Sequence, residues 1–264
     1  MLIKKYCPIL LSMPRNGSTW VQSYIRASYK SRGDGVIPNM GKTLHQKQSS
    51  SEFHNEFFGD QEYSQLDTKA KIHLIETLEK LDLVMCHKAF ANMFMNKPDL
   101  FKWFQSFYKD YNIILLRRRN IWKTYISLLF HNTIDKHVDM KENLHSWHGI
   151  GIDEKKEDLL KAAIQTYKVP FKFNKEHFAD FTKLVRFYQD EVIPAFPDKW
   201  QMWLEDLSDE KLAEMFKVDV QKEVTPLKRL NYLTYFKPKE LKLIQDTFEE
   251  RFDNEFQFYG YEYK

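Results

Sequence analysis

The sequence has few cysteines and no long apolar run. Cys7 and Cys86 are the only two cysteines among 264 residues. Each lies in a short apolar stretch, so we expect buried thiols and not a disulfide framework. No stretch approaches the roughly 18 apolar residues that a membrane-spanning helix needs, and the apolar run after the basic residues 1–6 is too short for a signal peptide. These absences predict a soluble, cytoplasmic protein without a membrane partner.

The chain also lacks a strong excess of charge of either sign. It has 40 Lys and Arg against 37 Asp and Glu, a formal net charge of +3. Nucleic-acid-binding proteins usually concentrate basic residues in a stripe, so we expect no nucleic-acid partner. A local basic pocket for a small polyanion is compatible with this balance. Hydrophobic residues make up 43% of the chain, enough for a sizeable core.

Short apolar runs alternate along the chain with segments of helical periodicity. The runs at 9–11 and 112–116 are continuous enough for buried strands of a parallel sheet. We therefore predict an α/β fold, a single domain over 1–264 with a central, mostly parallel sheet and helices on both faces. Further strands are expected at 83–86, ending at His87 and Lys88, and at 200–204. Helices are expected to end near Lys30, to cover 66–81, to run from Pro98 to about Lys109, and to cover 121–130, 178–192, a segment from Ser208, and 241–252.

Two polar segments interrupt this pattern. Residues 31–62 form a polar insert, which is either a mobile lid over a substrate or a disordered surface loop. Residues 131–160 are rich in histidine. A metal site would need close histidine pairs with supporting acids, and His145 with His148 is a weak candidate. We therefore expect no metal.

A small polar loop, 14–19, follows the first predicted strand and precedes a helix. Gly17 allows the backbone to approach an anion. The first N–H groups of the helix, with the hydroxyls of Ser18 and Thr19, would point toward that ligand. Arg15 adds a positive charge. The segment is therefore a candidate phosphate-binding loop, with an ordinary strand–turn–helix junction as the alternative.

This loop is not a Walker A motif, because that motif has Lys directly after its second Gly and this chain has Ser18 there. After the strand, the sequence reads Arg15-Asn16-Gly17-Ser18-Thr19-Trp20. The pattern is a basic residue, any residue, Gly, then Ser or Thr, followed by Thr and Trp. This order resembles the 5′-phosphosulfate loop of the sulfotransferases that use 3′-phosphoadenosine 5′-phosphosulfate (PAPS). The loop residues that the resemblance implies in binding PAPS are Arg15, Asn16, Gly17, Ser18, Thr19 and Trp20.

The resemblance also implies a role for each part of this loop. Arg15 would steady the bridging oxygen and the leaving phosphate, which makes it a candidate catalytic residue. Ser18 and Thr19 would hold the 5′-phosphate. Trp20 would stack near the adenine.

A second strand end carries the other half of the resemblance. Arg119-Asn120 with Ser127 eight residues after the Arg matches the 3′-phosphate motif of the same family. Arg119 can donate two parallel hydrogen bonds to phosphate oxygens, and Ser127 lies about two turns along the following helix. The neighbouring Arg117 and Arg118 are expected to form structural ion pairs.

Three weaker matches extend the resemblance. His87 stands in a run that is similar to the family's Lys-Thr-His segment, so it is the implied general base for the acceptor's proton. The alternatives are a structural histidine and a carboxylate base elsewhere. The segment around Leu204 is similar to a Tyr-Glu-Asp-Leu strand end, with Leu204 in place of the Tyr. Lys228 and Arg229 lie in a segment that resembles the one closing over the 3′-phosphate.

Together these motifs predict a sulfotransferase with a fold like that of the P-loop nucleotide kinases. The expected reaction is in-line transfer of a sulfuryl group from PAPS to a hydroxyl or amine of a small-molecule or glycan acceptor. The nucleotide 3′,5′-bisphosphate PAP is the product, and fixed cations stabilise the charge without a metal. The alternatives are an ATP-dependent small-molecule kinase with a divergent loop, and a non-catalytic nucleotide-binding protein that would need neither Arg15 nor His87.

Overall fold

In the computed structural model, the described residues are 8–31, 67–80, 88–137, 154–219 and 231–251. The chain divides into two compact units. The first contains residues 1–117 and 184–224, and the second contains residues 118–183 and 225–264. The single domain expected over the whole chain stays a prediction.

The first unit is built on a parallel sheet. Its strands are β1 (Ile9–Ser12), β2 (Lys88–Phe90), β3 (Ile113–Arg117) and β4 (Trp200–Trp203), and their spatial order is β2-β1-β3-β4. All three strand pairs are parallel, with Ser12 opposite Phe90 and Leu116. The described part of the chain is therefore an α/β protein with an all-parallel sheet flanked by helices, which confirms the coarse fold prediction.

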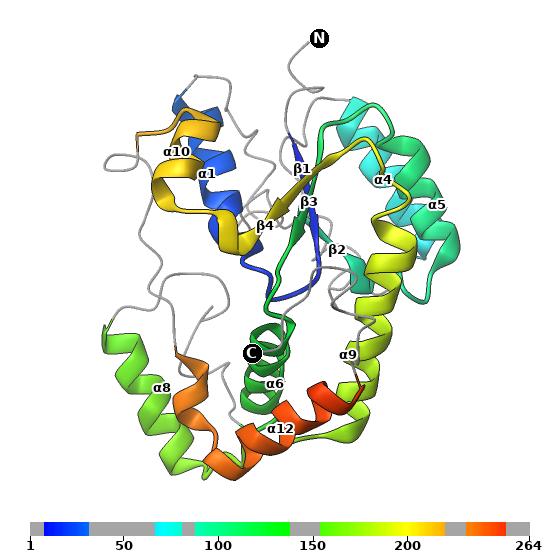
Figure 1. Cartoon of the computed structure of the whole chain (residues 1–264). Coiled ribbons are helices and arrows are strands. Elements are labelled where there is room, and N and C mark those ends of the chain that lie inside the picture. The colour runs from blue at the N-terminus through cyan, green and yellow to red at the C-terminus, as the bar shows by residue number, and fades with distance from the viewer. Residues whose placement is uncertain (1–7, 32–66, 81–87, 138–153, 220–230, 252–264) are drawn as a thin grey trace. The chain divides into compact units, whose positions relative to one another are not determined.

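Helices cover both faces of this sheet (Figure 1). On one face, α1 (Ser18–Ser31) and α10 (Asp209–Phe216) lie side by side, and α4 (Thr68–Lys80) and α5 (Pro98–Phe107) lie on the other. Successive side chains of a strand point to opposite faces of the sheet, so α1 and α10 cover every second side chain of the strands. The buried cluster on that face is Leu10, Val21, Tyr24, Ile25, Ala27, Ile114, Leu116, Met202, Leu212, Phe216 and Val218.

The predicted end of the second strand was wrong. We expected it to stop at His87 and Lys88, but β2 starts at Lys88 and ends at Phe90. Residues 83–86 lie outside the described residues. Pairing with β1 decides the end of β2, because Ser12 is the last residue of β1 and lies opposite Phe90. A strand at the edge of the described sheet tolerates a Lys, which is why an apolar run alone located it poorly.

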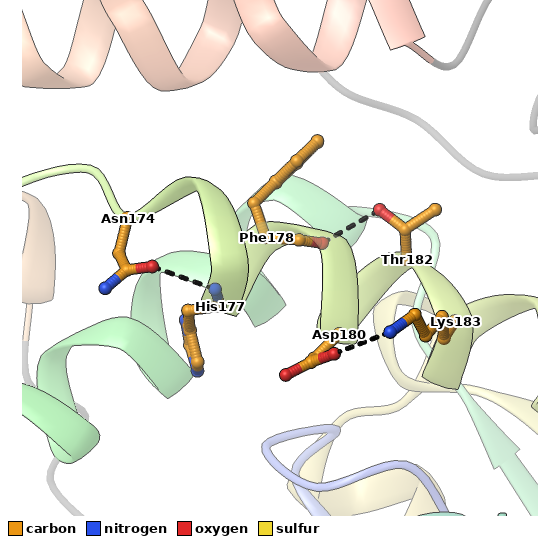
Figure 2. A network of polar contacts seen from close by, with 6 residues as sticks. All are labelled: Asn174, His177, Phe178, Asp180, Thr182 and Lys183. Atoms are coloured by element: carbon orange, nitrogen blue, oxygen red, sulfur yellow. Dashed lines mark hydrogen bonds and ion pairs between the residues drawn. The ribbon is translucent and has the colours of Figure 1, made fainter.

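The helices of the second unit pack around aromatic rings. They are α6 (Ile121–His137), α8 (Glu154–Thr166), the first part of α9 (Lys175–Phe187) and α12 (Pro238–Arg251). Tyr125 of α6 is fully buried, and its ring lies 5.3–5.6 Å from the rings of Phe178, Phe181 and Phe248. Within α9, Asn174 Oδ1 accepts from the backbone N–H of His177 and so caps the first turn (Figure 2).

α6 runs further than the apolar spacing predicted, whereas the helix predicted over 178–192 ends where expected but changes its helix type. α6 continues to His137 and not to about residue 130, because the buried Ile134 extends its apolar face by another turn. α9 is followed by a π-helical segment, Tyr188–Val192. Within the described residues, no helix is both long enough and apolar enough to cross a bilayer.

Candidate functional site

The phosphate-loop candidate lies at the switch point of the sheet. β1 and β3 are neighbours, but the chain continues from β1 toward β2 on one side and from β3 toward β4 on the other. Open α/β sheets bind ligands outside the carboxyl ends of their strands at such a point. β1 ends at Ser12 and α1 begins at Ser18, so residues 13–17 form the loop at this position.

The loop backbone is left-handed at two residues. Arg15 has φ 67° and Gly17 has φ 76°. Such a conformation is unfavourable for a residue with a Cβ, and its presence in Arg15 favours a functional reason for the turn. Turns with left-handed residues present successive backbone N–H groups that bind anions, and the N-terminus of α1 follows directly. The backbone of Gly17 starts that helix, since its carbonyl accepts from Trp20 and Val21.

Leu204 occupies the space beside Gly17. A Cβ built on Gly17 would lie 2.5 Å from Leu204 Cδ1, which is closer than real Cβ atoms approach, and a tight 3.1 Å from Cδ2. Leu204 comes from the turn Leu204–Asp206, which follows β4. The sequence singled out Leu204 as the replacement for the Tyr of a strand-end motif, and in the structure its side chain packs against the loop.

Asn16 and Tyr188 tie the ends of β1 and β3 together. Asn16 is fully buried, and its Nδ2 donates to the carbonyl of Leu116 at 3.4 Å. The hydroxyl of Tyr188, also fully buried, lies 3.1 Å from the carbonyl of Leu11 and 3.2 Å from that of Leu116. Sequence reasoning missed this role of Tyr188 and treated it as an apolar helix position. The signal was its hydroxyl, because a buried Tyr usually hydrogen-bonds.

Arg117 links β3 to two other elements. Its Nη1 donates to Gln201 Oε1 at 3.0 Å and its Nη2 donates to Gln189 Oε1 at 3.3 Å. Its guanidinium carbon lies 3.9 Å from the centroid of the Trp203 ring. These contacts are to two side-chain amides and an aromatic face, and the ion pairs expected for Arg117 and Arg118 stay a prediction. Arg117 therefore holds the π-helical segment and β4 against the end of β3.

The remaining loop residues belong to the start of α1. Ser18 is buried, and Thr19 and Trp20 are half-buried. Trp20 Nε1 donates to Asp209 Oδ1 at 2.8 Å, and the hydroxyl of Tyr24 donates to the same oxygen at 2.5 Å. Burial and then the Asp209 carboxylate raise the pKa of Tyr24, so the phenol stays protonated at neutral pH. The structure thus adds Tyr24 and Asp209 to the residues that the sequence indicated.

The 3′-phosphate candidates belong to the second unit. Asn120 is the N-cap of α6, since its Oδ1 accepts from the backbone N–H of Lys123 at 2.9 Å. Ser127 lies seven residues later, on the same face of the helix as Asn120, and is 3% exposed. Arg119 immediately precedes the cap and is half-buried. Arg119 and Asn120 therefore directly precede α6, and Ser127 lies about two turns into it, which is the spacing that the motif predicted.

Several predicted site residues lie outside the described part of the chain. They are His87, Lys228 and Arg229, with residues 32–62 of the insert and both His145 and His148. At the carboxyl end of β2, level with Ser12, the residue is Phe90, so the strand-end position assigned to His87 belongs to Phe90. Within the described residues, no three or more His, Cys, Asp or Glu gather in a way that could hold a metal ion.

The chain was also compared with known proteins. Neither models of protein families, nor curated proteins, nor solved structures gave a match. Its function must therefore be inferred from its own residues and geometry.

Proposed function

We propose that the chain transfers a sulfuryl group from PAPS to the hydroxyl or amine of a small-molecule or glycan acceptor and releases PAP. The observation that carries this proposal is the loop at 13–17. It joins a central parallel strand to α1 at the switch point, and it holds Arg15 and Gly17 in left-handed conformations. The proposal includes a likeness of this sheet and loop to those of P-loop nucleotide kinases.

Anion binding would use the backbone of the loop and the start of α1. The N-terminal N–H groups of a helix and its dipole favour a phosphate, and the hydroxyls of Ser18 and Thr19 would add two donors. Gly17 has no side chain of its own, and the side chain of Leu204 fills the space where its Cβ would stand, so the ligand would approach the loop from another side. This part of the site would hold the 5′-phosphosulfate.

Catalysis would depend on Arg15. In the transfer step, a bond forms between sulfur and the acceptor oxygen or nitrogen while the bond from sulfur to the bridging phosphate oxygen breaks. The electron pair stays on that oxygen, so negative charge grows there. A fixed cation at this position stabilises the transition state more than the ground state. No metal ion is required in this scheme.

The acceptor's proton needs a base, and His87 is the proposed one. A neutral imidazole can take this proton near neutral pH. A carboxylate base is the alternative, since the strand-end position expected for His87 belongs to Phe90. The rate–pH profile of His87→Asn distinguishes the two: loss of the acidic limb with much-reduced turnover supports His87, and near-wild-type turnover contradicts it.

Nucleotide binding provides the direct test of the proposed function. We expect PAP to raise the melting temperature without Mg²⁺, by a stabilisation of about 2.7 kcal/mol when PAP is present at about 100 times its Kd. A transfer assay with radiolabelled sulfate on PAPS, run across phenols, steroids, amines and glycans, then identifies the acceptor class. Arg15→Ala should bind PAP and lose turnover, because its effect falls on kcat.

Two outcomes would contradict this proposal. Stabilisation by ATP only in the presence of Mg²⁺ would favour a small-molecule kinase. Stabilisation by PAP with no transfer to any acceptor would favour a non-catalytic nucleotide-binding protein.

A further inference from the structure

Trp20, Tyr24 and Asp209 form a hydrogen-bonded cluster beside the switch-point loop. Trp20 lies in the first turn of α1, three residues after Gly17, and Asp209 is the first residue of α10. One oxygen, Asp209 Oδ1, accepts from both Trp20 Nε1 and the Tyr24 hydroxyl. The contact joins two helices that lie side by side on the same face of the sheet (Figure 1).

These contacts fix the plane of the Trp20 ring. Its N–H is held by Asp209 at 2.8 Å. Its ring meets the ring of Tyr24 edge to face, with centroids 6.4 Å apart and planes at 89°. Tyr24 is fully buried and cannot move aside, whereas Trp20 is half-buried, so part of the indole is accessible to a ligand. An aromatic ring held in this way is ready to receive another flat ring without losing rotamer freedom.

We propose that Asp209 is a positioning residue that holds Trp20 as the stacking platform for the purine base of the nucleotide. The inference rests on the proposed function, because it assigns base selection to the same site. The loop would bind the 5′-phosphosulfate, and the base would stack one helical turn away on Trp20. Asp209 acts through Trp20 and does not touch the nucleotide.

The preference of the protein for one nucleotide base over another measures the role of Trp20 and Asp209 separately from folding. We would determine the Kd of PAP and of uridine 3′,5′-bisphosphate by calorimetry, since both carry the same phosphates on different bases. Base–aromatic stacking is sequence-tolerant but scales with the size of the base. Trp20→Ala should weaken PAP binding by about five- to hundredfold and lower the preference for PAP over the uridine compound.

Substitutions of Asp209 test the positioning role itself. Asp209→Ala should lower the same preference, and Asp209→Asn should restore it, because the amide oxygen still accepts from Trp20. Glu210→Gln is the matched control, since it removes a negative charge from the same turn of α10 and should keep the wild-type preference.

The outcomes separate the two proposals. A wild-type chain that binds neither bisphosphate contradicts the proposed function and the inference with it. A wild-type chain that prefers PAP, with an Asp209→Ala variant of equal preference, overturns the inference alone. Equal weakening of both bisphosphates in Asp209→Ala would also overturn it, because that result indicates a structural role only.

Discussion

Gly17 is constrained in two independent ways. Its φ of 76° is one that residues with a Cβ rarely adopt, and the Leu204 side chain stands where a Cβ would be. The first constraint is a backbone preference and the second is a packing contact with a turn far along the chain. The two constraints respond differently when Leu204 is shortened: the packing conflict should be relieved, and the backbone cost should remain.

Gly17→Ala should destabilise the fold. A left-handed residue with a Cβ costs roughly 1–2 kcal/mol, and displacement of Leu204 adds to that cost. The measurement is the urea midpoint at unchanged m-value. In a double-mutant cycle, Leu204→Ala should make the Gly17→Ala cost smaller without abolishing it. Equal costs in both backgrounds would show that Leu204 does not press on this position.

At the scale of elements, α6 and α9 of the second unit are joined through a histidine. His177 of α9 lies with Nε2 2.6 Å from Asn132 Nδ2 of α6, and its ring lies 5.5 Å from that of Tyr125. Figure 2 shows the turn of α9 that carries it, with Asn174 capping its backbone. Burial first, and then the nearby Lys136, lower the pKa of His177, while Asp180 opposes them.

This lowered pKa predicts a loss of stability in weak acid. An unfolded His titrates near pH 6.5, so below that pH the unfolded chain binds a proton that the folded chain resists. The stabilisation is present above about pH 6.5 and falls as the pH decreases toward the lowered pKa. The melting temperature of His177→Gln should therefore change less between about pH 7 and 5 than that of the wild type. His137→Gln, which removes an exposed imidazole from α6, is the matched control. A His177→Gln variant with the full wild-type acid response would contradict the assignment.

Sequence patterns located most elements but not all of their ends. The continuous apolar run before Arg117 gave β3, and Pro98 gave the start of α5, because both signals are local. The ends of β2 and α6 depend on what pairs or packs with them: Ser12 opposite Phe90, and the burial of Ile134. The pairing that ends β2 leaves no trace in local periodicity, whereas Ile134 continues the apolar spacing of α6 by one more turn.

At the scale of the molecule, the two nucleotide-binding motifs that the sequence predicts belong to different units. The loop at 13–17 is in the first unit, and Arg119 and Ser127 are in the second. The motifs could be found from sequence because each is a short run at a strand end. The residues that support the loop could not, since Asp209 is 189 positions from Trp20 and Tyr188 is 177 positions from Leu11.

Arg119→Ala tests whether Arg119 binds the 3′-phosphate of the proposed nucleotide. If Arg119 binds the 3′-phosphate, PAP should lose roughly 1.5–3 kcal/mol of binding free energy, about ten- to hundredfold in affinity. Adenosine 5′-phosphosulfate has no 3′-phosphate, so its affinity should stay near the wild-type value. Calorimetry with both ligands decides between these results. Equal losses for the two would show that Arg119 does not read the 3′-phosphate.

The division into units has a consequence for any attempt to take the protein apart. The chain passes from one unit to the other after residues 117, 183 and 224, so neither unit is a single continuous segment. A cut after residue 117 leaves β3 on one fragment and its sheet neighbour β4 on the other. A fragment that ends at residue 224 has the complete first unit but lacks α12, and with it Phe248, which packs on Tyr125. Limited proteolysis and truncation therefore cannot yield a self-contained half, and each unit has to be probed by substitutions in the intact chain.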